Sequence, residues 1–132
     1  DELLNKIISE KLNSEDSVNG FILDGYPRTL DQSDFLLSYL NANNLNLNLI
    51  FEFKIDFKTV EHRILSRSQK EKRSDDNIEV IKTRLNKYMN ETYPVSEFFS
   101  LKFKDKYHTI NASKEILQIK TELMKIIKKG EF

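Results

Sequence analysis

Residues 20–29 have the sequence Gly-Phe-Ile-Leu-Asp-Gly-Tyr-Pro-Arg-Thr, which predicts a strand, a turn and the start of a helix. The apolar run over 20–24 is typical of a buried parallel strand. Gly25-Tyr26-Pro27 ends that run in a turn, and Thr29 can cap a helix that continues to about residue 40. In an open α/β sheet, the point where a strand meets a helix is the usual ligand crevice.

Short apolar strands and amphipathic helices alternate on both sides of this stretch. Residues 1–13 predict a helix and 13–19 a polar loop. Downstream, we expect a strand over 49–53, a helix that Asp56 caps and that runs through Leu65, and a charged loop or flap over 66–74. Asp76 and Glu79 form a capping box that starts the next helix, and Pro94 interrupts or restarts that helix. A strand over 107–110 and a helix over 113–129 complete the predicted order. This order predicts an α/β fold with a doubly wound parallel sheet.

Composition narrows the possible classes of function. The 21 basic residues balance the 21 acidic ones and neither sign forms a long block, so we expect no nucleic-acid or membrane partner. The chain has no cysteine, and its two histidines fit no metal-binding spacing. It shows no signal peptide and no apolar run near the roughly 20 residues of a membrane span, so a cytoplasmic location is expected. Because it starts at Asp1 without methionine, we expect a processed or excised piece.

Arginine is used sparingly in this chain. Only five of the 21 basic residues are arginine, so lysine supplies the ordinary surface charge. A guanidinium group is planar, always charged and able to grip two anionic oxygens at once. The five arginines, which therefore indicate a phosphate-handling protein, are Arg28, Arg63, Arg67, Arg73 and Arg84.

Two motifs resemble those of the adenylate kinases. Residues 20–29, with Gln32 three positions on, resemble the family's nucleoside monophosphate signature. The second signature is matched by Arg73-Ser74-Asp75-Asp76-Asn77, Glu79, Arg84, Leu85, Tyr88, Thr92 and Pro94. The resemblance runs from Asp1 to about Lys125. It implies ATP and AMP as partners, Mg²⁺ as cofactor, and reversible phosphoryl transfer that gives two ADP.

The resemblance implies an AMP site at the first motif. Gly25 would offer a backbone contact to the adenine, Arg28 would bind the phosphate, and Gln32 would hydrogen-bond the base edge. Arg73 and Arg84 would be further AMP-phosphate ligands. The family also tends to hold the peptide before the proline cis. From the residues alone, the alternative is a plain turn with Arg28 facing solvent.

The resemblance also implies an ATP site. Arg63 and Arg67 lie four residues apart on one helix face. Arg63 would pack on the ATP adenine, Arg67 would grip the phosphates, and Lys114 lies in a loop that touches the adenine through its backbone. The alternative for the arginine pair is a basic helix end, where the positive side chains interact favourably with the negative end of the helix dipole. The catalytic set is expected to converge on one cleft and comprises Arg28, Arg67, Arg73 and Arg84.

A short lid over residues 63–76 is a further implication. Asp75 and Asp76 would order the lid arginines and help hinge the lid; their alternative role is as helix caps. Arg84 is expected on a partly apolar face, where a guanidinium needs an anionic partner to offset its desolvation. The alternative to a phosphate contact of Arg84 is therefore an ion pair with Asp75 or Asp76. In short-lid kinases Ser-Gly usually stands where this chain has Glu71-Lys72, so lid closure is the step this difference affects. Asp24 would lie near the water shell of Mg²⁺, which is held mainly through nucleotide phosphates; the alternative is a helix-capping or turn aspartate.

The family's opening strand and its GxxxxGK[ST] phosphate loop do not occur in this sequence, whose glycines are at 20, 25 and 130. The strand's place is between strands 20–24 and 49–53, so we expect an incomplete fold. We expect one partial kinase domain in which 1–19 end the AMP-binding region, 20–62 and 77–132 form the core, and 63–76 form the lid. As the C-terminal part of a kinase, the chain alone should be inactive, with the missing N-terminal segment as a partner.

Two other functions are compatible with parts of the pattern. One is a UMP/CMP kinase, in which asparagine commonly follows the motif arginine; Thr29 and Gln32 match the AMP-preferring branch. The other is a non-catalytic nucleotide-binding module that has dispensed with the phosphate loop. Retention of five arginines argues against the module, since binding alone needs no lid chemistry.

Overall fold

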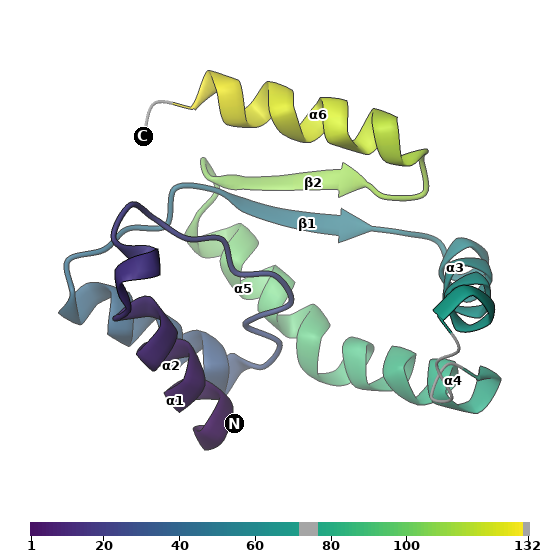
Figure 1. The fold of residues 1–132 in the computed structure, drawn as a ribbon, viewed down its shortest axis with the longest axis horizontal. Helices are drawn as coiled ribbons and strands as arrows, with labels where there is room; N and C mark the ends of the chain where they lie inside the picture. The colour runs from purple at the N-terminus through teal and green to yellow at the C-terminus, as the bar shows by residue number, and fades with distance from the viewer. Residues whose placement is uncertain (72–76, 131–132) are drawn as a thin grey trace. The chain divides into compact units, whose positions relative to one another are not determined.

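The structure, a computed structural model, describes residues 1–71 and 77–130. It divides into two compact units. Unit 1 contains Asp1–Asn46 and Tyr88–Glu97, and unit 2 contains the described residues of Leu47–Lys87 and Phe98–Phe132. Figure 1 follows the chain by residue number through both.

Unit 1 is built from helices. Helix α1 (Glu2–Leu12) and the short 3₁₀ turn η1 (Glu15–Ser17) precede α2 (Leu30–Ala42), and α1 and α2 lie side by side (Figure 1). On α2, Leu36 and Leu40 are buried four residues apart, as expected for the inner face of an amphipathic helix. Thr29 caps α2 as predicted, because its Oγ1 accepts a hydrogen bond from the Gln32 amide at 3.1 Å.

The predicted strand over residues 20–24 is wrong. These residues have no regular secondary structure, and the Ile22 side chain is 93% exposed. A strand exists only when a neighbouring strand supplies its hydrogen-bond ladder. No segment within residues 1–71 and 77–130 pairs with this stretch, so its apolar sequence alone does not make it a strand.

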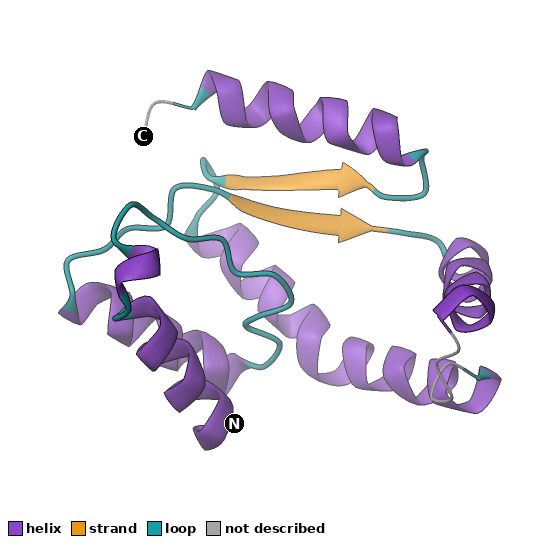
Figure 2. Ribbon diagram, viewed as in Figure 1, coloured by secondary structure: helices purple, strands orange, loops and turns teal. Residues whose placement is uncertain are grey.

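Unit 2 contains a parallel sheet of two strands, β1 (Ile50–Lys54) and β2 (Tyr107–Asn111). Both strands were predicted, and Phe53 pairs with Ile110, which is 2% exposed. The ring of His108 packs on its register partner Phe51 with centroids 5.8 Å apart, as expected for a structural histidine. Helix α6 (Ile116–Lys129) lies along β2 and runs back against the strand direction (Figures 1 and 2). The predicted parallel α/β class is confirmed in an incomplete form.

Helix α3 (Phe57–Glu71) is longer than predicted. Asp56 caps it as expected, with Oδ1 accepting from the Thr59 amide at 2.9 Å. The loop predicted from residue 66 is wrong as far as residue 71, because these residues are helical. Their arginine, glutamine, lysine and glutamate favour helix, and neither glycine nor proline interrupts them. The remainder of that predicted loop, 72–76, lies outside the described residues.

The next described helix is α4 (Ile78–Lys87). Asn77 caps this helix, since its Oδ1 accepts from the Val80 amide at 3.0 Å; Asp76, the predicted cap, lies outside the described residues. A π-helical segment, η2 (Tyr88–Thr92), then leads into α5 (Tyr93–Lys102). The sequence predicted that Pro94 interrupts or restarts the helix. The structure has a π-helical turn, wider than an α-helical one, just before this proline, which has no N–H to donate. No helix in the described parts of the chain is both long and apolar enough to cross a bilayer.

Candidate functional site

The turn at residues 25–28 in unit 1 has an unusual backbone. Gly25 has φ +74°, in the left-handed region that favours glycine. The Tyr26–Pro27 peptide is cis, as the family resemblance implied. The Tyr26 side chain is buried, its hydroxyl donates to Asn5 Oδ1 at 2.7 Å, and burial raises the pKa of the phenol. The buried ring therefore anchors the turn to α1.

Arg28 is exposed but held in place. Its backbone N–H donates to Gln32 Oε1 at 2.7 Å, its Nε donates to the Gly25 carbonyl at 2.7 Å, and its own carbonyl accepts from Thr92 Oγ1 at 2.9 Å. A Cβ at residue 25 would lie 2.9 Å from Arg28 Nη2, so the guanidinium can take this position only beside a glycine. These contacts do not use the two Nη atoms, which are the pair that grips an oxyanion.

Gln32 is almost fully buried at the start of α2. Its Oε1 accepts from the Arg28 amide, and its Nε2 donates to Asp1 Oδ1 at 2.9 Å. Both ends of the amide are therefore bonded within the chain. To read a base edge, Gln32 would have to exchange its contact with Asp1 for one with the ligand.

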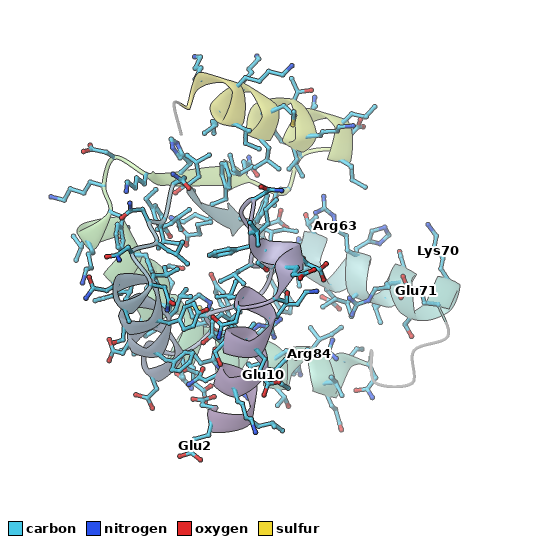
Figure 3. The ribbon with its side chains drawn as sticks, turned by 60° about the vertical axis from the view of Figure 1, so that its left-hand side comes forward. Glu2, Glu10, Arg63, Lys70, Glu71 and Arg84 are labelled. Carbon is cyan, nitrogen blue, oxygen red and sulfur yellow. The ribbon has the colours of Figure 1, made fainter. Side chains whose placement is uncertain are left out.

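In unit 2, Arg63 on α3 bonds to the loop between β2 and α6. Its Nη1 donates to the Ala112 carbonyl at 2.6 Å and its Nη2 to the Lys114 carbonyl at 3.0 Å. The alternative of a basic helix end is wrong for Arg63, because α3 continues to Glu71 (Figure 3). The Lys114 ammonium forms an ion pair with Glu122, so Lys114 contacts Arg63 only through its backbone carbonyl.

Asp56 connects the start of α3 to the same loop. Its Oδ2 accepts from Thr59 Oγ1 and from Ser113 Oγ, each at 2.7 Å, and its backbone N–H donates to Ser113 Oγ at 3.1 Å. The hydrogen bonds from the Thr59 side chain, then Ser113, then the Thr59 amide lower the pKa of Asp56 from 3.8 to about 2. The sequence indicated the helix cap but not Ser113, since no local pattern links residues 57 positions apart.

An apolar hollow of about 400 Å³ borders Arg63 and Ala112. Apolar side chains of α6, with Phe53 of β1, form most of the remaining wall. Ligand sites are typically concave and apolar with a few fixed polar groups, and the Arg63 guanidinium supplies such a group here. The hollow is therefore a candidate base subsite within unit 2.

The other predicted site residues lie in several places. Arg67 is half-buried on α3, and Arg84 is exposed on α4 (Figure 3), so the expectation that Arg84 is desolvated on an apolar face is wrong. Asp24 is exposed beside the turn of unit 1. Arg73, Asp75 and Asp76 lie outside the described residues. Across 1–71 and 77–130, no three acidic or histidine side chains form a cluster that could hold a metal ion.

Comparison with known proteins identifies the family to which these sites belong. The adenylate kinase family profile matches residues 1–104. The adenylate kinase of Brucella ovis is 35% identical over 133 aligned residues, which cover 96% of this chain and 68% of the relative. That of Brucella abortus is 40% identical over 106 residues, which cover 76% of this chain and 55% of the relative. The chain belongs to the adenylate kinase family, whose members transfer phosphoryl groups between nucleotides.

Replacing Gly25 with alanine should displace the Arg28 guanidinium. The new Cβ would meet Nη2 at 2.9 Å, and a left-handed φ adds a penalty of roughly 1–2 kcal/mol for a residue with a side chain. Gly20→Ala is the matched control, because φ is +116° there but nothing lies within 4 Å of the new Cβ. In ¹⁵N NMR spectra, Gly25→Ala should shift the Arg28 Nε–H resonance and Gly20→Ala should not. Equal shifts would contradict this account of the turn.

The Asp56 carboxyl group should titrate near pH 2 in the folded chain, against an ordinary value of 3.8. Because folding favours the carboxylate, its contribution to stability is complete above about pH 3.8 and is lost as pH falls toward 2. Carbon-13 NMR of the Asp56 carboxyl carbon measures this midpoint directly. Thr59→Val and Ser113→Ala should each raise it by removing a donor, and an unchanged midpoint in both variants would refute the assigned cause.

Proposed function

We propose that this chain forms the AMP-binding turn and the ATP-base subsite of an adenylate kinase that converts ATP and AMP to two ADP. The observation that carries the proposal is the state of Arg28: its backbone and Nε are fixed by Gly25, Gln32 and Thr92, while its Nη pair is not part of those contacts. A guanidinium fixed in this way is prepared for a phosphate before the ligand arrives.

The AMP side of the proposal uses only groups of unit 1. Arg28 would bind the AMP phosphate through its two Nη atoms in a bidentate contact. Gly25 would let the adenine approach the backbone, since no side chain stands there. Gln32 would read the base edge after it releases Asp1, which makes base recognition an exchange of hydrogen bonds.

The ATP side uses unit 2. The base would enter the hollow beside Arg63, against the backbone of the loop that carries Lys114. Arg67 lies one helical turn further along α3 and would bind the ATP phosphates. Residues 63–76 would act as the short lid that excludes water, with Asp75 and Asp76 ordering its arginines.

Phosphoryl transfer needs in-line positioning and positive charge around the moving group, and no covalent enzyme intermediate. We assign that charge to Arg28, Arg67, Arg73 and Arg84, and we assign AMP-phosphate binding to Arg73 and Arg84 as well. Mg²⁺, when bound, neutralises charge on the ATP phosphates. Asp24 is exposed, so its carboxylate would be available to the water shell of such an ion, and no group of three acidic or histidine side chains among the described residues could hold the ion directly. A cytoplasmic location stays a prediction.

Arg28→Ala should weaken AMP binding about 10- to 100-fold, because a hydrogen bond to a charged group contributes roughly 1.5–3 kcal/mol. Arg28→Lys should also weaken it, since an ammonium cannot form the bidentate contact. Lys6→Ala is the control for loss of one positive charge on unit 1. Calorimetric titration with AMP and then CMP measures each affinity. Unchanged AMP affinity in Arg28→Ala would refute the site, and tighter CMP binding would favour the pyrimidine kinase.

The chain of 132 residues should bind nucleotide without turning it over at ordinary kinase rates of about 1–100 s⁻¹. The reason is that its sequence contains no GxxxxGK[ST] loop to hold the ATP phosphates. A coupled assay for ADP formation from ATP and AMP measures this, with Arg28→Ala as the control for contaminating kinase. Turnover at those rates that disappears in Arg28→Ala would show that the chain is competent by itself.

A further inference from the structure

Two ties join α3 to the same three residues of the β2–α6 loop. The first is formed by Asp56 with Ser113, through Ser113 Oγ to Oδ2 at 2.7 Å and Asp56 N–H to Ser113 Oγ at 3.1 Å. The second is formed by Arg63 with the carbonyls on either side of Ser113, those of Ala112 and Lys114. The two ties lie about two helical turns apart on α3, so together they fix both the position and the tilt of the loop.

The first tie goes beyond what a helix cap requires. A cap needs one side-chain oxygen to accept from an amide of the first turn, and Asp56 Oδ1 does this with Thr59. The other oxygen, Oδ2, is left for the Ser113 hydroxyl and the Thr59 hydroxyl. Ser113 is also held by Asn111, whose Oδ1 accepts from the Ser113 amide at 3.0 Å. The hydroxyl of Ser113 thus lies in a preformed network at the end of β2.

The second tie fixes the orientation of the Arg63 guanidinium. A guanidinium donates its hydrogen bonds within its own plane, whereas a heterocyclic base stacks on the face of that plane. The carbonyls of Ala112 and Lys114 occupy in-plane positions, so the position of the loop sets the direction in which the face of Arg63 points. Because the hollow borders both Arg63 and Ala112, a small displacement of the loop changes two of its walls together.

We propose that Asp56 and Ser113 are positioning residues for the nucleotide base at this subsite: their contact holds the loop, and the loop holds the Arg63 face. The inference rests on the proposed function, because it assigns the hollow beside Arg63 to the ATP base. Neither residue touches the base. Their effect on binding passes through the backbone at residues 112–114.

Four variants separate this role from capping. Ser113→Ala removes the tie and leaves the cap intact. Asp56→Asn keeps an oxygen for the Thr59 amide and removes the carboxylate that accepts from Ser113. Thr59→Val is the matched control, since it removes a hydrogen bond to the same Oδ2 but leaves Ser113 in place. Ser113→Thr restores a hydroxyl.

The measurement is an NMR titration of the full 132-residue chain with ATP, and separately with AMP, following backbone amides of both units. Ser113→Ala and Asp56→Asn should each weaken ATP binding about 3- to 10-fold, the range expected for one hydrogen bond. AMP binding should change less than about 2-fold, which also reports that the variants are folded. The double variant should be no weaker than the weaker single variant, because both remove one interaction. Thr59→Val should bind ATP normally, and Ser113→Thr should recover most of the affinity.

Two results would overturn the proposal. If Ser113→Ala binds ATP as tightly as the unsubstituted chain while its melting temperature falls, the contact is only structural. If Thr59→Val loses as much ATP affinity as Asp56→Asn, the hydrogen bonds of Asp56 Oδ2 within α3, and not its contact with Ser113, are responsible. Failure of the proposed function looks different: the unsubstituted chain would then show no ATP-dependent shifts at residues 112–114. Should Asp56→Asn fail to fold, Ser113→Ala still decides the question.

Discussion

The hydrogen bond from Arg28 Nε to the Gly25 carbonyl is the contact on which the candidate AMP site depends. It requires that residue 25 has no Cβ and adopts a left-handed φ, and both conditions come from one glycine. Gln32 and Thr92 then fix the backbone of Arg28 from two other segments of unit 1. A long, flexible side chain is in this way given one orientation before any ligand is bound, which reduces the ordering cost of binding.

Arg63 in unit 2 is held by the same chemical means. Its partners, like that of Arg28, are backbone carbonyls. A carboxylate in these places would fix the guanidinium equally well but would neutralise its charge. Carbonyl oxygens orient the group and leave it a full cation, which suits the nucleotide contacts proposed for both arginines. The chain therefore separates the task of positioning an arginine from the task of balancing its charge.

Local chemistry made part of this arrangement predictable. Thr29 and Asp56 are caps with short-range signals, and the strands at residues 50–54 and 107–111 are rich in the aromatic and β-branched residues that favour strands. The strand expected at 20–24 failed because a strand also needs a neighbour. The contact between Asp56 and Ser113, and the engagement of the Gln32 amide by Asp1, were not predictable, since residues far apart in the sequence make them. Both motifs lie within residues 1–104, which match the adenylate kinase family.

The π-helical segment at Tyr88–Thr92 has a consequence for how this family member can vary in length. Such a segment holds one more residue than the same stretch of α-helix would. Because the segment absorbs that extra residue, deleting Met89, Asn90 or Glu91 would let the ordinary ladder close and would leave Tyr88 and Thr92 near their present faces of the helix. The hydroxyl that now reaches the Arg28 carbonyl would then stay on the same side. A shortened relative could therefore keep every motif letter and this contact as well.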